Sequence, residues 1–478
     1  MTDGANDLRG AFWRAMGDGA IAHVIMLRDA GIMDTEAMEA LLPAVATARD
    51  GSPPELPIAQ LGAIFDQRID ANAVQGVVGA ASVGRGTIDL MATASRIVLR
   101  DQMLKQIDEL DALRGEMEAF TDSHAVTMMP AFSVSAVAQS TSLGHISSAL
   151  VTTLERASDS LWTAFAMTNR SPLGAGALAG TGFPTDRSRS AELVGFDGVI
   201  DQTYDAVSSS DHFHALADAI DRIAVPVARW LDELTVWIRT DPSALTLDES
   251  WSLTDPSVPQ WSAPGGIAAL AAHARRTSGD AATLRSTVAH LPWGPVAGEL
   301  GTLHAAANLA MTNCSVLMER SIALMKDALF VNRAYFANRA GRSLVTISDL
   351  VDFLMVEEQL DPAAARAITS ITLTRMRESG IESSGITAEM LDTAAMMTIG
   401  RELKVEFEAI SRYLAPRRFV ERRNVTGGPA PSAVRSWLAG ATERRRADEA
   451  RLAIARREIS TASQLRNAAI NEAISPEG

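Results

Sequence analysis

The chain has little cysteine, few aromatic residues and no long apolar run. Its 478 residues include one cysteine, Cys314, which excludes an internal disulfide and a cysteine-based zinc site. Aromatic residues make up 5% of the chain, with only 3 Tyr. No stretch reaches the ~18 uninterrupted apolar residues of a membrane span, and Met1–Gly4 lacks the basic and apolar regions of a secretory signal. We therefore expect a cytoplasmic protein with no metal site and no membrane partner.

Acidic residues outnumber basic ones, 58 to 43, and give a formal net charge of −15. A nucleic-acid-binding surface needs clustered Lys and Arg, so we expect no nucleic-acid partner. The basic run Arg444–Arg446 lies among Glu and Asp and is predicted to be a solvated helical face. A small-molecule substrate and further protein subunits remain as the expected partners.

Helices are favoured throughout the chain, because Ala, Leu, Met and Arg recur and lose little entropy on entering a helix. In the clearest pattern, from Asp211 to Ile238, apolar residues step by three or four positions, and Pro226 is expected to kink the helix without ending it. Similar patterns cover residues 127–168, 266–291 and 298–337. We therefore predict an all-α protein built around a long central bundle.

Three domains are predicted from changes in helix length and from turn signals. Residues 1–100 form an N-terminal helical domain, residues 101–340 the central long-helix bundle, and residues 341–478 a C-terminal helical domain with a charged tail. In the third part the predicted helices shorten and glycine-containing turns become frequent.

Motifs of several common enzyme classes are absent: there is no His-Glu-x-x-His, no Gly-x-Ser-x-Gly and no Walker-type phosphate loop. The segment Gly174–Gly180 has the wrong glycine spacing for a dinucleotide loop. Cys314 lies in an apolar helical run and is predicted to be an inert core thiol. These patterns give no cofactor site, and we expect no cofactor.

Four regions in order along the chain share motifs with one known family. Met129–Gln139 is similar to a Met-Pro-Gly-Tyr-Thr-His-Leu-Gln-x-Ala-Gln segment, and Ser171–Arg187 carries Ser-Pro-Leu-Gly-Ala-Gly-Ala-Leu-Ala-Gly. Gly195–Gly198 with Asp205–Ser208 matches a mid-helix motif, and Val420–Pro431 ends in Gly-Gly-x-Ala-Pro. Together these regions resemble the argininosuccinate lyases of the aspartase/fumarase superfamily.

The resemblance implies a mostly helical three-domain subunit whose central helices form a twenty-helix core in a homotetramer, with each active site built from three chains. It also implies a β-elimination that releases fumarate from a substituted succinate. A base removes a carbon-bound proton, nearby donors stabilise the resulting carbanion, and an acid assists the leaving nitrogen.

The chain departs from the family pattern in its catalytic loop, Ser252–Pro264. Asp255 and Pro256 stand where the family has paired serines, one of them the presumed base, and Trp261 and Ser262 stand in place of lysines. A shift of one or two residues in the loop would place Ser257 or Ser262 as the base.

Other family positions also lose charged or hydrogen-bonding residues. The Thr-His dipeptide becomes Ser133-Val134, the later Tyr-Asn-Lys-Asp-Leu-Gln segment becomes residues 295–300, and of an Arg-rich cluster only Arg85 and Asp89 remain. Groups that would bind several carboxylates are replaced by apolar or small residues, so ordinary argininosuccinate cleavage is not expected.

The resemblance gives two groups of candidate site residues. Asp255 and Ser257 are the candidate catalytic residues, and Asp255 is expected to have a raised pKa in an apolar cleft; the alternative is that Asp255 caps a turn before Pro256. Trp261 either stacks on a flat substrate or fills the vacated cleft. The predicted substrate-binding residues are Arg85, Asp89, Ser133, Gln139, Thr203 and Trp261.

Three functions remain open. The chain is a repurposed lyase, isomerase or cyclase acting on a less polar small molecule, or a catalytically inactive scaffold or partner subunit of a complete lyase. The third is retained elimination of an amino acid or polycarboxylate by a remodelled loop. An open cleft favours the first function, and a cleft filled by Trp261 favours the second.

Overall fold

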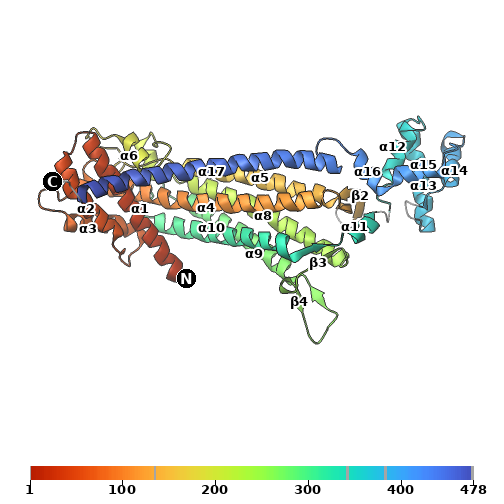
Figure 1. The fold of residues 1–478 in the computed structure, drawn as a ribbon, viewed down its shortest axis with the longest axis horizontal. Helices are drawn as coiled ribbons and strands as arrows, with labels where there is room; N and C mark the ends of the chain where they lie inside the picture. Colours follow the sequence, from red (N-terminus) through yellow and green to blue (C-terminus); the bar gives the residue numbers. More distant parts are fainter. Residues whose placement is uncertain (1, 134–135, 341–343, 382–384, 475–478) are drawn as a thin grey trace.

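The computed structural model describes residues 2–133, 136–340, 344–381 and 385–474. The molecule is elongated, with the N-terminal helices at one end and a small helical unit at the other (Figure 1). The N-terminal end contains α1 (Thr2–Asp29), α2 (Thr35–Asp50), α3 (Ile58–Asn72) and the short turn η1 (Ala80–Ser82). Asp34 caps α2, because its carboxylate accepts a hydrogen bond of 2.7 Å from the backbone N–H of Ala37.

Five long helices form the bundle that the apolar periodicity predicts. They are α4 (Thr87–Ser123), α5 (Leu143–Thr168), α8 (Asp211–Thr240), α9 (Gly265–Ala289) and α10 (Leu300–Ala323). α8 packs against α5 and α9, while α4 packs against α5 and α10. Pro226 lies inside α8 without ending it. The all-α fold class is confirmed, and no helix among the described residues is long and apolar enough to cross a membrane.

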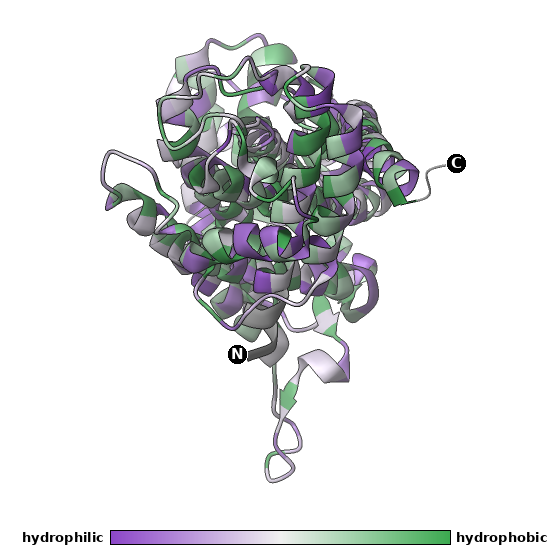
Figure 2. Cartoon of the chain, turned by 90° about the vertical axis from the view of Figure 1, so that its left-hand side faces the viewer, coloured by the Kyte–Doolittle hydropathy of each residue, from purple (hydrophilic) through white to green (hydrophobic). Residues whose placement is uncertain are grey.

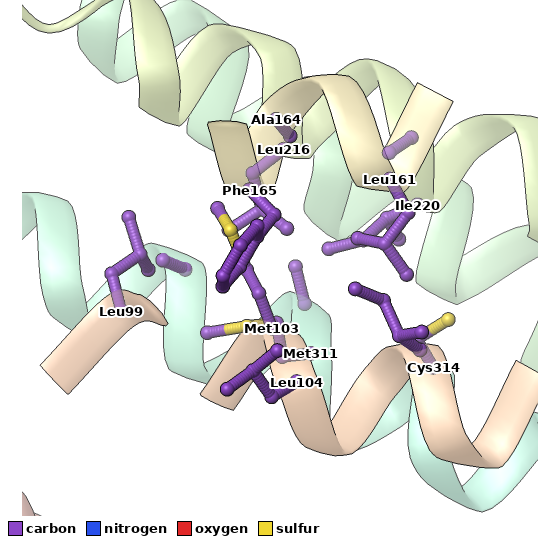
Figure 3. Packing of buried hydrophobic residues seen from close by; sticks show 14 of the residues in the cluster. Leu99, Met103, Leu104, Leu161, Ala164, Phe165, Leu216, Ile220, Met311 and Cys314 are labelled. Carbon is purple, nitrogen blue, oxygen red and sulfur yellow. The ribbon is translucent and has the colours of Figure 1, made fainter. Parts of the chain in front are cut away.

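The bundle core is apolar where four helices meet (Figure 3). Met103 of α4, Phe165 of α5, Ile220 of α8 and Cys314 of α10 gather there, and each is at most 3% exposed. Burial raises the pKa of the Cys314 thiol far above its ordinary value. The prediction of an inert core thiol is therefore confirmed, since the thiolate is the reactive form.

The predicted helix over residues 127–168 is wrong in its first part. Residues 128–133 and 136–142 are strands instead, and β1 (Met128–Ser133) pairs antiparallel with β2 (Ala136–Ser142). Pro130 has no N–H to donate within a helix, and the Ser, Thr and Val residues of the hairpin have low helix propensity.

The predicted helix over residues 298–337 is interrupted. The π-turn η3 (Leu324–Ala328) and the strand β6 (Leu329–Val331) separate α10 from α11 (Arg333–Ala340). β6 pairs with β3 (Leu245–Leu247). Pairing with a strand distant in sequence overrides the local helical pattern here.

A separate small core lies at the other end of the molecule. It contains α12 (Ser348–Val356), α13 (Pro362–Ser379), α14 (Ala388–Ile399) and α15 (Phe407–Leu414). Next to it, α16 (Pro416–Arg422) contacts the β1–β2 hairpin. Asp349 of α12, 1% exposed, forms ion pairs with Arg422 and Arg423, so this buried carboxylate ties the unit to the α16 segment.

The last helix, α17 (Pro431–Ile474), runs back along the bundle (Figure 1) and contacts α2, α4, α5 and α6 (Arg187–Val194). Arg444 forms an ion pair with Glu155 of α5, and Arg445 with Glu118 of α4. The predicted solvated face holds for Arg444, whose side chain is 53% exposed, but is wrong for Arg445, which is 18% exposed and joins α17 to α4. The charged tail of the third predicted domain lies on the second, and the predicted boundary at residue 100 falls inside α4.

Candidate functional site

Arg85, a predicted substrate-binding residue, is buried just before α4 begins. Its Nη2 donates to Oδ1 of Asp66 at 2.6 Å, and its Nε donates to the carbonyl oxygen of Ala81 at 2.9 Å. The guanidinium thus ties α3 and η1 to the start of α4. No sequence pattern singles out Asp66, which lies 19 residues before Arg85. Substrate binding by Arg85 stays a prediction.

The Asp89 carboxylate, 0% exposed, holds the glycine-rich loop against α4. Its Oδ2 accepts hydrogen bonds from the backbone N–H groups of Gly174 and Gly176, both at 2.9 Å, and its Oδ1 accepts one from Gly86 at 2.9 Å. Desolvation raises the pKa of Asp89 to about 6, against the opposite effect of these donors and Arg85. Gly174 and Gly176 have φ of +80° and +64°, a conformation that favours glycine.

Replacing Asp89 with Ala is expected to lower the free energy of unfolding by about 3–5 kcal/mol, because two buried N–H groups and one partly buried N–H group lose their acceptor. Asp89→Asn is expected to lose roughly half as much, since one amide oxygen still accepts while the NH₂ group opposes a donor. Urea unfolding followed by circular dichroism measures both. Asp327→Ala, at an exposed carboxylate, is the matched control; equal losses in all three variants would refute the role of Asp89.

Thr203 is the first residue of α7 (Thr203–Ser208) and lies beside the same loop. A Cβ built on Gly180 would be 3.7 Å from Cγ2 of Thr203. Ala175 of the same loop and Ala206 of α7 belong to one small buried apolar cluster. The structure therefore brings Thr203 to the same end of the bundle as Asp89.

Ser133 and Gln139 lie on the β1–β2 hairpin, at the opposite end of the bundle from α2 and α3 (Figure 1). Ser133 pairs with Ala136 and Gln139 with Ala131, and the register shifts between these pairs. Gln139 is exposed. The β1–β2 hairpin and the start of α4 are thus separated by the length of the bundle.

The segment corresponding to the catalytic loop is a hairpin that projects from the side of the bundle (Figures 1 and 2). After the turn η2 (Glu249–Trp251), β4 (Leu253–Thr254) pairs with β5 (Ser262–Ala263). At its root, the guanidinium of Arg320 lies over the Trp251 ring, 5.5 Å from its centroid. This contact with α10 fixes the base of the hairpin while its tip stays in solvent.

Asp255 and Ser257 are bonded to each other in the part of the hairpin that projects. Oδ1 of Asp255 accepts hydrogen bonds from the backbone N–H of Ser257 at 2.8 Å and from its hydroxyl at 2.6 Å. These two bonds lower the pKa of Asp255. The raised pKa expected for Asp255 is wrong for the single chain, because the carboxylate is exposed to water. The alternative interpretation, that Asp255 caps a turn at Pro256, is confirmed.

Trp261 belongs to the same exposed surface. Its side chain is 45% exposed, and Leu253 and Val258 of the hairpin are 58% and 39% exposed. The expectation that Trp261 fills a vacated cleft therefore has no support in the described chain. An apolar hairpin surface of this kind is typical of a segment that another surface covers.

One chain alone does not bring the predicted site residues together. They form three groups: Arg85, Asp89 and Thr203 near the N-terminal helices, Ser133 and Gln139 on the distant hairpin, and Asp255, Ser257 and Trp261 on the projecting loop. Within the ranges that the structure describes, no three His, Cys, Asp or Glu side chains are placed to hold a metal ion.

Comparison with known proteins gives concordant results for sequence and fold. A family model described as lyase matches residues 71–248. The argininosuccinate lyase of Methanosarcina mazei is 27% identical over 428 residues, covering 87% of this chain and 84% of that protein. The crystal structure of EDDS lyase in complex with formate gives a TM-score of 0.82 at 24% identity, over 98% of this chain and 93% of that one. The crystal structure of class II fumarase from Schistosoma mansoni gives a TM-score of 0.65 at 12% identity, over 86% of this chain and 90% of that one.

Proposed function

Because the chain is an argininosuccinate lyase-like member of the aspartase/fumarase superfamily, we propose that it catalyses β-elimination, or a related lyase or isomerase reaction, on a small molecule less polar than argininosuccinate. Family positions for Lys, Asn and His carry Trp261, Ala263 and Val134. Each charge-assisted hydrogen bond contributes about 1.5–3 kcal/mol, so their loss selects against substrates with several carboxylates.

The observation that carries the proposal is the Asp255–Ser257 pair on an unobstructed hairpin. The pair holds a carboxylate and a hydroxyl 2.6 Å apart, which is the spacing that proton transfer between them needs. Trp261 on the same hairpin is 45% exposed and packs into no cavity of the described chain. A hairpin of this form is able to close over a substrate held elsewhere.

In the proposed reaction, a proton leaves the carbon next to the substrate carboxyl group, the bond from the adjacent carbon to the heteroatom breaks, and its electron pair leaves with the heteroatom. The heteroatom takes a proton from water, and Asp255 later returns its proton to water, so the products are an unsaturated acid and an amine or alcohol. Ser257 takes the carbon-bound proton while its hydroxyl proton passes to Asp255. Burial of the hairpin against another subunit would remove water from Asp255 and raise its pKa toward the range of a useful base.

We further propose a homotetramer, because the candidate residues lie in three separated groups that only different copies can bring together. Apolar side chains exposed on the bundle support this assembly: Val225 of α8 is 41% exposed and Leu309 of α10 is 52% exposed. Several exposed apolar residues along long helices are typical of a surface that packs between subunits.

A second candidate function, an inactive scaffold or a partner subunit of a complete lyase, is favoured by other contacts. Arg85 and Asp89 are occupied by bonds within the chain, and no lysine remains in the loop to stabilise a carbanion. The lowered pKa of Asp255 also makes it a weak base in the single chain.

The two functions are separated by assaying purified protein for fumarate release, by ultraviolet absorbance, from N- and O-substituted succinates with apolar substituents. The M. mazei argininosuccinate lyase with its own substrate is the positive control. Fumarate release from a succinate with an apolar substituent would support the lyase function. Silence across the series, with the control active, would exclude succinates as substrates and leave a different small molecule or the inactive subunit.

A further inference from the structure

A cavity of about 410 Å³ lies where the C-terminal turns of α8 face β1 and α11. Its volume falls within the ~300–1,000 Å³ typical of small-molecule sites. The cavity is lined by the buried side chains of Trp237, Ala244 and Phe336, which are 3%, 1% and 4% exposed. It contains none of the residues assigned to the proposed elimination.

Part of the cavity wall is apolar and open to water. Phe132 of β1 is 37% exposed and Val236 of α8 is 48% exposed, and both line the cavity. An apolar group placed between them would be stabilised in proportion to the apolar area removed from water. The wall therefore favours a ligand with an apolar side chain.

The cavity also carries two opposite charges that the chain does not pair. Glu233 and Arg239 both line it, and neither has a hydrogen-bond or ion-pair partner among the described residues. The nearby Asp241 differs, because it accepts a hydrogen bond of 2.9 Å from Nε of Arg339 and another from the Tyr335 hydroxyl. The unpaired charges are thus one carboxylate and one guanidinium.

We infer that this cavity binds an α-amino acid with an apolar side chain. The ammonium group pairs with Glu233, the carboxylate pairs with the Arg239 guanidinium, and the side chain packs against Phe132 and Val236. A ligand with a single charge would leave either Glu233 or Arg239 unpaired. A zwitterion with an apolar body is the small-molecule class that satisfies all three features.

The test is isothermal titration calorimetry of the full chain with L-phenylalanine, phenylpropionate and phenylethylamine. The second compound lacks the ammonium group and the third lacks the carboxylate. We expect each to bind at least about tenfold more weakly than L-phenylalanine, because each loses one charge-assisted pair. Absence of L-phenylalanine binding, or equal affinity for all three compounds, would overturn the inference.

Variants locate the site. Glu233→Gln is expected to weaken L-phenylalanine binding about tenfold and to leave phenylpropionate binding unchanged, while Arg239→Gln should weaken both. Glu443→Gln, at an exposed position of α17, is the matched control. Unchanged affinity in both cavity variants would overturn the assignment. Binding is measured without turnover, so its outcome is independent of the proposed elimination.

Discussion

Lowering the pH from 7 to 4 is expected to unfold the protein, because four histidines are held neutral in its interior. Desolvation lowers the pKa of His304 to about 3, and those of His23, His124 and His212 to about 4. Each has an ordinary pKa of 6.5. Between these values the unfolded chain binds protons that the folded chain excludes, so the free energy of unfolding falls as the pH falls.

The sizes of the pKa shifts show that the histidines determine how the free energy of unfolding changes with pH. For His304, the interval from its ordinary pKa of 6.5 down to pH 4 corresponds to roughly 3 kcal/mol of lost stability, because its folded-state pKa of about 3 keeps it neutral throughout that interval. Asp89 and Asp111 act in the opposite sense, since burial raises the pKa of each to about 6 and their protonation below that pH favours the fold. Four histidines with larger shifts outweigh two carboxylates. The net loss is several kcal/mol, comparable with the ~5–15 kcal/mol stability of a typical domain.

The acid midpoint is measured by tryptophan fluorescence during acid titration, with circular dichroism as a second probe. His304→Gln keeps a partner for the Ser95 hydroxyl, which lies 2.7 Å from Nε2 of His304, and is expected to move the midpoint to lower pH. His214→Gln is the control, because this side chain is 45% exposed. Identical midpoints in both variants and the parent would show that the buried imidazoles do not drive acid unfolding.

Regular local patterns made much of the fold predictable. The apolar spacing from Asp211 to Ile238 corresponds to one helix, α8, because its buried residues lie on the face packed against α5 and α9. Cys314 was predictable as a core residue for the same reason. Helical periodicity failed where a distant contact decides the outcome, as in residues 329–331, which pair with residues 245–247.

Site geometry depended even more on distant contacts. The partners of Asp89 in the glycine-rich loop lie 85 and 87 residues away, and no local pattern indicates them. The resemblance to argininosuccinate lyases gave positions for the candidate residues, but not the bonds that occupy Arg85 and Asp89. The resemblance also did not indicate that the Asp255 carboxylate is exposed to water. The pKa of a carboxyl group depends on its burial in the folded molecule, which the sequence does not show.

Asp255→Asn and Ser257→Ala are each expected to lower kcat by about 10²–10⁴-fold on any substituted succinate that the protein cleaves, because each removes one end of the proton-transfer pair. The double variant is expected to be no slower than the slower single variant, since residues that act as a unit are not additive. KM should change little, because neither side chain is proposed to bind the substrate. Steady-state kinetics of product release measure these effects.

The chain contains its own matched control. Asp248 and Ser250 form the same Asp-x-Ser turn, in which Oδ1 of Asp248 accepts from the Ser250 backbone N–H at 3.0 Å and from its hydroxyl at 2.6 Å. Asp248→Asn removes an equivalent turn outside the catalytic pair and is expected to leave kcat unchanged. Ser262→Ala tests the other loop register. Loss of activity in Ser262→Ala but not in Ser257→Ala would assign the base to Ser262, because only the residue that takes the carbon-bound proton is sensitive to loss of its hydroxyl.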